Sequence, residues 1–487
     1  MRRIVSAIEE APLGWGFIII CAEAIIAFRI ALEITFSHVL NDVLSIYVSI
    51  VFFNAWFLAL FFSLILYLSF VGKIAQKKVA RVLLFGLPVI LLPPIGLILG
   101  ISDRIVFLVG TWKEVLYHAA TFLMFHEYLG VFFAIEIIIF LIGVFFFLTL
   151  HGAVIRSFIG VIVAYGVLIF LGTEPVFFET ILKSGSFGFS YDQRFAFLNI
   201  VLLTASGILI FFRERVGQAR HILSRFRPRR MMFFFSLCIA MLMGALASGH
   251  FYFLNFSAGL LLFCFFIAHT LLINDMADVA VDRVSNPARP YPSGALGKGT
   301  MHFLHGAALV AMGAMLVVFQ SPALFVITAV NIVLSVAYST FRLRKNPFSF
   351  LLAAWGWGSA VLYGFFAQDP SSAFISTSAL TLFYAFFLLL CFFIPVKDIK
   401  DIVGDAREGV RNFMTMAGYE KGKIVTAISA SISFPAFAIV MDDALMLISS
   451  LFFSVCAGIF IMRYERFGER PLFLLLFFFL LLGIFVI

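Results

Sequence analysis

The chain has 487 residues, of which 63% are hydrophobic and 12% are charged, and its mean hydropathy is +1.10. These values exclude a soluble enzyme and indicate an all-α polytopic membrane protein. The net charge of +8 does not point to nucleic acid, because the basic residues lie in short connections between apolar runs, where membrane orientation explains them. The five cysteines lie in apolar runs without a C-x-x-C pair, which argues against a disulfide framework and a zinc site.

The apolar pattern of the first half of the sequence predicts an N-terminal membrane domain of unknown function over residues 1–212. About six apolar runs are long enough to cross a bilayer. They lie near 13–35, 44–71, 82–101, 130–150, 153–172 and 195–212. The first run has no evident small-residue cleavage site after it, so we interpret it as a retained span rather than a signal peptide.

Four ionisable residues lie in or near these spans. They are Glu23, Arg29, Glu33 and Glu136. Ionisable residues inside a membrane are functional candidates by default. Arg29 and Glu33, however, are spaced to neutralise each other on one helix face, and we favour a structural role for all four.

A basic segment at 213–230 predicts a cytoplasmic linker, and nine further apolar runs follow it. They lie near 231–249, 251–273, 301–319, 322–340, 349–367, 374–395, 422–440, 443–462 and 471–487. The prediction is therefore about 15 transmembrane helices, with the last nine in a second domain over 231–487.

The distribution of basic residues predicts a cytoplasmic N-terminus. With this orientation most of the 34 Lys and Arg residues fall in cytoplasmic segments, as the positive-inside rule requires. In the second half, the outer connections at 249–251, 320–321, 368–373 and 441–442 contain no Lys or Arg.

Two aspartate clusters interrupt the second half, and both are predicted to face the cytoplasm. Asp275, Asp278 and Asp282 follow one apolar run, and the same D-x2-D-x3-D spacing recurs at Asp398, Asp401 and Asp405. This spacing places three carboxylates on one face of a helix. Carboxylates beside a membrane ionise readily only with cations to bind, and oxygen ligands suit Mg²⁺ bridged to substrate phosphates. Two solvated acidic loops are the disfavoured alternative, since cytoplasmic loops are usually basic.

At these residues the chain resembles the UbiA superfamily of intramembrane prenyltransferases. Its first motif, N-D-x-x-D-x-x-x-D, is matched by Asn274 to Asp282, and its second, D-x-x-x-D, by Asp401 to Asp405. The resemblance covers a little over half the chain. It implies a nine-helix bundle with a central cavity, in which an isoprenoid group moves from a polyprenyl diphosphate to a lipid-like or aromatic acceptor with Mg²⁺ as cofactor.

The resemblance also implies roles for particular residues. The implied catalytic residues are Asp275, Asp278, Asp282, Asp401 and Asp405. The implied metal ligands are the same five and Asp398. The implied diphosphate-binding residues are Asn274, Arg289, Tyr338, Arg342, Lys345 and Lys397. Arg342 stands where the family's Y-x-x-x-K element has Lys, so the charge is kept but its geometry changes.

Several alternatives stay open. Arg342 and Lys345 also fit topological anchors, and Arg289 and Lys397 fit counter-charges for nearby aspartates. For His302 and His305, interfacial histidines are favoured over metal ligands. The protein as a whole also fits a membrane carrier that uses the acidic clusters as cation sites, or another transferase or cyclase reaction on the UbiA scaffold. Carrier sites more often lie at mid-bilayer, whereas these clusters lie at span ends.

Overall fold

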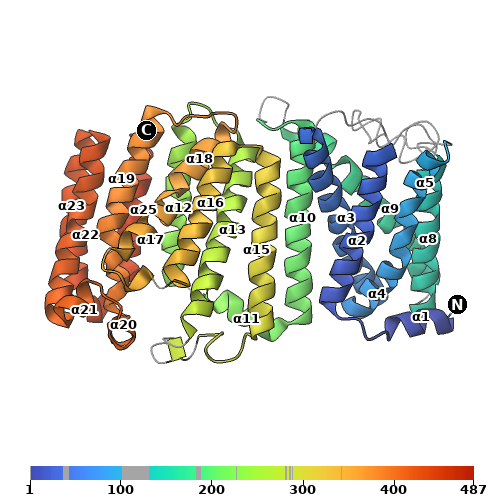
Figure 1. Cartoon of the computed structure of the whole chain (residues 1–487), viewed down its shortest axis with the longest axis horizontal. Coiled ribbons are helices and arrows are strands. Elements are labelled where there is room, and N and C mark those ends of the chain that lie inside the picture. The colour runs from blue at the N-terminus through green and yellow to red at the C-terminus, as the bar shows by residue number, and fades with distance from the viewer. Residues whose placement is uncertain are drawn as a thin grey trace. The chain divides into compact units, whose positions relative to one another are not determined.

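The computed structural model of the chain describes residues 2–36, 43–100, 131–152, 154–182, 188–225, 228–279, 282–283, 287, 289–341 and 343–486. Every regular element within these ranges is a helix, as the composition predicts (Figure 1). The chain forms two compact units, an N-terminal unit (Met1–Val216) and a C-terminal unit (Gly217–Ile487). Their boundary lies inside the basic segment at 213–230, which contains helix α11 (Val216–Arg225).

The helices of the N-terminal unit are α1 (Arg2–Glu9), α2 (Trp15–Phe36), α3 (Val43–Gly72), α4 (Gln76–Gly86), the 3₁₀ helix η1 (Leu87–Leu91), α5 (Leu92–Ile98), α8 (Val131–His151), α9 (Val154–Leu182) and α10 (Tyr191–Glu214).

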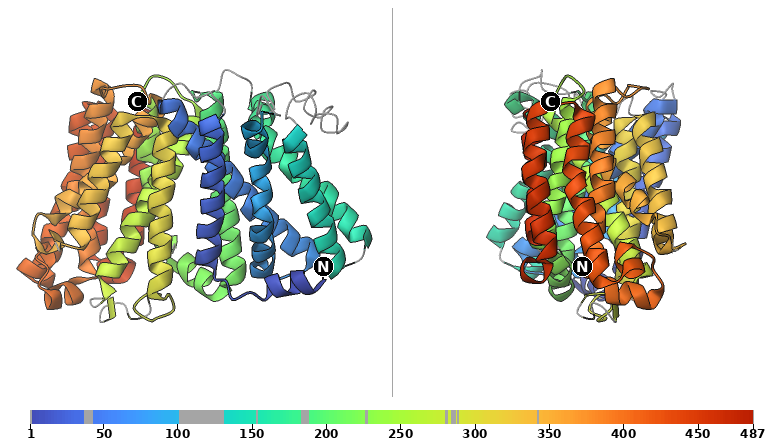
Figure 2. Two further views of the ribbon diagram at one scale, coloured as in Figure 1. Left: turned by 45° about the vertical axis from the view of Figure 1, so that its right-hand side comes forward. Right: turned by 90° about the vertical axis from the view of Figure 1, so that its left-hand side faces the viewer.

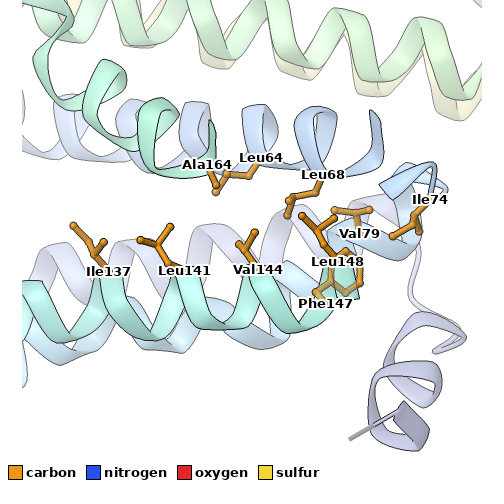
Figure 3. Packing of buried hydrophobic residues seen from close by; sticks show 10 residues of the cluster. All are labelled: Leu64, Leu68, Ile74, Val79, Ile137, Leu141, Val144, Phe147, Leu148 and Ala164. Carbon is orange, nitrogen blue, oxygen red and sulfur yellow. The ribbon is translucent and has the colours of Figure 1, made fainter. Parts of the chain in front are cut away.

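A core of apolar side chains holds several of these helices together. Leu64 and Leu68 of α3 point toward α8, on which Val144 lies (Figure 3). Ile74, in the turn after α3, and Val79 of α4 extend the cluster at one end (Figure 3). Since lipid is as apolar as these side chains, the contacts stabilise the unit by close packing rather than by removal from water.

The helices of the C-terminal unit after α11 are α12 (Pro228–Leu246), α13 (Phe253–Ala277), α15 (Lys298–Phe319), α16 (Pro322–Ser339), η3 (Leu343–Lys345), α17 (Ser349–Gly358), α18 (Ala360–Gln368), α19 (Thr377–Phe393), η4 (Ile394–Ile399), α20 (Ile402–Glu408), α21 (Phe413–Ala417), α22 (Tyr419–Met441), α23 (Ala444–Met462), α24 (Tyr464–Phe467) and α25 (Arg470–Gly483).

The long helices of the C-terminal unit run side by side, close to parallel with one another (Figures 1 and 2). In the span Thr377–Ile399, which contains α19, 67% of an 18-residue apolar stretch is buried, whereas the share is 28% in the span Ala444–Met462, which is α23. α19 is therefore a central helix of this unit, and much of α23 faces outward, where its exposed apolar side chains suit contact with lipid.

Twelve helical segments within the described ranges are long and apolar enough to cross a membrane, and each matches a run predicted from the sequence. Three predicted runs do not meet this standard. The run near 13–35 forms α2, which carries three ionisable side chains. The runs near 231–249 and 471–487 form the shorter apolar helices Met231–Leu246 and Arg470–Gly483. The protein is thus an all-α polytopic membrane protein, but the predicted count of about 15 spans is not confirmed.

Candidate active site

The first aspartate segment begins in the last turn of α13. This helix contains Asn274 and Asp275 and ends at Ala277, and Asp278 is its C-cap residue. The Asp278 N–H donates to the Asn274 carbonyl at 2.9 Å, and the Asp282 N–H donates to the Asp278 carbonyl at 2.8 Å. Helical spacing therefore continues past the end of α13. All three carboxylates are buried, which is costly unless donors or cations are close to them.

Two side-chain contacts position two of these carboxylates. Asn274 Nδ2 donates to Asp278 Oδ2 at 3.0 Å. Arg289, in the loop that follows, forms an ion pair with Asp282. In this structure Arg289 is thus the counter-charge of Asp282, one of the two roles that the sequence left open. A phosphate would have to bind through the remaining N–H donors of the same guanidinium.

The second aspartate segment begins in the 3₁₀ helix η4, which follows α19 directly. Asp398 lies in η4, Asp401 is the N-cap residue of α20, and Asp405 lies within α20. The Asp405 N–H donates to the Asp401 carbonyl at 2.9 Å, and Asn412 Nδ2 donates to Asp405 Oδ2 at 2.9 Å. The carboxylates of Asp401 and Asp405 lie close enough to Asp398 to interact with it electrostatically, as does Lys397.

Lys397 connects this segment to α16. Its Nζ donates to Tyr338 Oη at 3.2 Å and lies 5.5 Å from the centre of the Tyr338 ring. η3 reaches the same region, because the Arg411 N–H donates to the Lys345 carbonyl at 3.3 Å. The structure therefore gathers Tyr338, Lys345 and Lys397 around the second segment. Arg342 lies outside the described residues.

Both aspartate segments lie at the same end of the C-terminal unit. Four spans separate them along the chain, and an even number of crossings returns the chain to the side from which it started. Figure 1 agrees, since the lower end of α13 and the labels of α20 and α21 all lie at the bottom of the view. This shared end is the arrangement that a joint site for one substrate requires.

The donor chemistry of the segments fits Mg²⁺, whereas the residues that the structure describes form no complete protein cage for a metal. Six carboxylates supply the hard oxygen ligands that this ion prefers. Among the described residues, however, no three or more His, Cys, Asp or Glu side chains are grouped so that they could hold a metal ion. Mg²⁺ commonly takes one or two carboxylates and completes its shell with water and substrate phosphates, so the residues fit a metal that enters with a diphosphate.

Two contacts near the site were not predicted from the sequence. Asn412 supports Asp405 and also caps α21 by accepting from the Thr415 N–H at 2.9 Å. The N-x-x-T pattern of a capping box was the available signal for it. His269, buried on α13, shares a hydrogen bond of 2.9 Å with His305 of α15. His305 thus pairs with another histidine, a partner that its i, i+3 spacing from His302 did not indicate.

Comparison with known proteins adds to this geometry. The model of the UbiA prenyltransferase family matches residues 233–484. The chain belongs to the UbiA prenyltransferase family. The matched range contains both aspartate segments, and it lies entirely within the C-terminal unit of this UbiA family member.

Curated proteins similar to this UbiA family chain include several digeranylgeranylglyceryl phosphate synthases. The digeranylgeranylglyceryl phosphate synthase of Sulfurisphaera tokodaii is 29% identical over 157 residues, which cover 32% of this chain and 55% of that protein. The enzyme of the same name from Ignicoccus hospitalis is 30% identical over 148 residues, which cover 30% of this chain and 48% of that protein. The chain thus spans about half the length of the curated relatives that it matches.

Among solved structures, the apo structure of a UbiA homolog from Aeropyrum pernix K1 has a TM-score of 0.44 and 19% sequence identity. The comparison covers 52% of this UbiA family chain and 96% of that one.

Proposed function

We propose that the protein is an intramembrane prenyltransferase, which moves an isoprenoid group from a polyprenyl diphosphate to a hydrophobic acceptor and releases diphosphate. The observation that carries the proposal is the position of two aspartate-rich segments at one end of a single helical bundle, inside the range that matches the UbiA family. Relatives named digeranylgeranylglyceryl phosphate synthase support a transferase of this kind.

In the proposed reaction, the bond between the first prenyl carbon and the diphosphate oxygen breaks. The acceptor then forms its bond to that carbon and loses a proton. When bound, Mg²⁺ would neutralise the negative charge of the leaving diphosphate. The residues proposed to hold it are Asp275, Asp278, Asp282, Asp398, Asp401 and Asp405.

Several side chains are proposed to orient the diphosphate. Lys397 donates from its ammonium to Tyr338 and lies close enough to Asp398 to interact with it electrostatically, so it offers a positive charge just after α19. Arg289 adds a second cation from the loop after the first segment. Asn274 orients the Asp278 carboxylate through its hydrogen bond. Arg342 and Lys345 are proposed to complete the set of phosphate ligands.

The finer proposal concerns the substrates and the orientation. A long isoprenoid donor and a lipid-like acceptor fit the membrane setting and the names of the relatives. The site is proposed to face the cytoplasm, because the connections at the opposite end of the C-terminal unit at 249–251, 320–321 and 441–442 carry no Lys or Arg.

The test is a transfer assay with purified full-length protein in detergent. The protein is incubated with Mg²⁺, with geranyl, farnesyl or geranylgeranyl diphosphate, and with glycerol phosphate lipids or aromatic acceptors, and products are identified by mass. Prenylated product and stoichiometric release of diphosphate are expected. Chelation with EDTA should stop the reaction, and added Mg²⁺ should restore it. Metal uptake into vesicles without any consumption of prenyl diphosphate would instead favour the carrier.

Asp278→Asn and Asp405→Asn test the assigned roles. Each removes one negative charge at almost constant shape, and turnover should fall by about 100-fold or more, the scale seen when charge stabilisation is removed from a transition state. Asp442→Asn is the matched control. Asp442 is the C-cap residue of α22, and the control makes the same Asp-to-Asn change there, away from both aspartate segments. Its backbone has a φ of 52°, which Asn tolerates. Near-normal turnover in a folded Asp278→Asn or Asp405→Asn variant would contradict the roles.

A further inference from the structure

The turn after α3 presents a lysine in an unusual backbone conformation. α3 ends at Gly72, and Lys73 follows with a φ of 54°, in the left-handed region where glycine is least strained. The Ile74 N–H donates to the Ser69 carbonyl at 3.2 Å, and Ser69 Oγ donates to the Ile74 carbonyl at 2.6 Å. These bonds fix the turn, so the backbone of Lys73 holds a defined position.

A cavity of about 650 Å³ opens beside this turn. Its volume is within the range of about 300–1,000 Å³ that is usual for ligand pockets. Among the described residues its lining has three cations, four apolar residues and no acidic side chain. The lining residues are Lys73, Arg156, Arg213, Phe70, Val71, Ile74 and Ala75. All seven belong to the N-terminal unit.

The three cations give the lining of the cavity a positive charge. Arg156 lies in the first turn of α9, where a cation adds to the positive end of the helix dipole instead of opposing it. Arg213 lies in the last turn of α10. Within the described part of the chain, none of the three cations forms an ion pair. An anion in the cavity would therefore relieve the repulsion among three positive charges.

The apolar part of the lining comes from the end of a membrane span and the turn after it. Phe70, near the end of the span Ile50–Gly72, is 75% exposed. Ile74 is anchored in the buried core of the unit (Figure 3). An anionic lipid matches both kinds of lining residue, because its phosphate would contact the cations while its chain contacts Phe70 and Val71. A free phosphate ion would use the cations alone.

We propose that the N-terminal unit binds the phosphate headgroup of an anionic membrane lipid in this cavity. Basic pockets between membrane helices are known to bind lipid headgroups by this combination of charge and apolar contact. The proposal is independent of the proposed transferase function, since none of the seven lining residues lies in the C-terminal unit.

The test is native mass spectrometry of purified full-length protein, titrated in detergent with dioleoyl phosphatidic acid. Saturable binding is expected, with much weaker binding of dioleoyl phosphatidylcholine, whose phosphate is masked by a cationic choline. The triple variant K73Q/R156Q/R213Q should bind phosphatidic acid roughly 100-fold more weakly, on the basis of the usual contribution of each cation to anionic lipid binding. The charge-preserving variant K73R/R156K/R213K should retain most of the affinity.

The matched control is R2Q/R3Q/K77Q, which removes three positive charges from the same unit at residues that do not line the cavity. It should bind phosphatidic acid as the wild type does. Equal affinities of the cavity variant and this control, when both show wild-type thermal unfolding without lipid, would mean that the cations serve only as topological anchors and would overturn the proposal. So would displacement of the lipid by inorganic phosphate at comparable concentration, since the site would then bind a free ion.

Discussion

Arg29 shows how this protein accommodates a charge inside an apolar unit. The side chain is 2% exposed, and Nε donates to Glu33 Oε1 at 2.8 Å. Nη1 donates to the carboxylate of Glu136 at 3.2 and 3.3 Å, and the guanidinium lies 4.4 Å from the ring centre of Phe57. The i, i+4 spacing predicted the first contact. No local pattern could predict the second, because Glu136 lies 107 residues away and reaches Arg29 only through tertiary packing.

At this position we predict that Arg29→Met destabilises the protein by about 3–5 kcal/mol, because it leaves two buried carboxylates without their cation. The triple variant R29M/E33Q/E136Q should recover part of this loss, since it removes the uncompensated charges as well. The measurement is unfolding by SDS titration in mixed micelles, followed by circular dichroism. A single variant as stable as wild type would show that the three side chains contribute nothing to stability.

The same limit applies to the candidate site. Spacing along the chain identified Asp275, Asp278 and Asp282, because carboxylates beside an apolar run are unusual and can be recognised without knowledge of the tertiary structure. The partner of Arg289 was left open between the substrate phosphate and a nearby aspartate, since Arg289 belongs to a loop whose path no periodicity describes. The contact of Lys397 with Tyr338 joins two helices that are far apart in the sequence, so only the fold could reveal it.

At the scale of whole elements, close helix contact in the C-terminal unit depends on two glycines. Gly244 of α12 lies against the backbone of Val361 in α18, and Gly364 of α18 lies against the backbone of Met241 in α12. A methyl group added at either glycine would overlap a carbonyl oxygen of the other helix. Small residues allow membrane helices to approach closely, and here each of the two helices contributes one glycine to the contact.

We predict that Gly244→Ala lowers the free energy of unfolding by roughly 1–3 kcal/mol, because α12 and α18 must move apart to admit the methyl group. Gly313→Ala in α15 is the matched control, since nothing lies within 4 Å of the added Cβ. The control should be neutral or stabilising by up to about 1 kcal/mol, from the higher helix propensity of alanine. Thermal unfolding of both variants in the same detergent makes the comparison, and equal shifts would argue against the contact.

The sequence located the membrane helices well, because hydropathy over a span is a local property. Three of the predicted spans are not confirmed, and the reasons are local too. The prediction counted α2, α12 and α25 as full spans, although α2 carries three ionisable residues and the apolar parts of the other two are short. Such helices cross a membrane when neighbouring helices cover their charged side chains or when the bilayer adapts to their short apolar length, and hydropathy contains no information about neighbouring helices.

For the molecule as a whole, the division into two units separates two kinds of site. Both aspartate segments and the residues proposed to bind diphosphate lie in the C-terminal unit, within the range that matches the UbiA family. The N-terminal unit contains the buried Arg29 with its two carboxylate partners and the cationic cavity beside Lys73. The motif content of the sequence assigns the aspartate segments to the second half, but the cavity could not be predicted, because its three cations come from three separate helix ends.

We predict that residues 217–487, expressed alone, retain prenyl transfer, because every residue proposed for the chemistry lies within that unit and its core helices pack on one another. Turnover with geranylgeranyl diphosphate and the best acceptor of the full chain is the measurement, beside Asp405→Asn in the same fragment as the inactive control. Adding residues 1–216 as a separate chain should leave turnover unchanged. If a folded fragment were inactive alone and active with 1–216 present, the N-terminal unit would have to supply part of the reaction, and the lipid site beside Lys73 would become the first place to look for an acceptor.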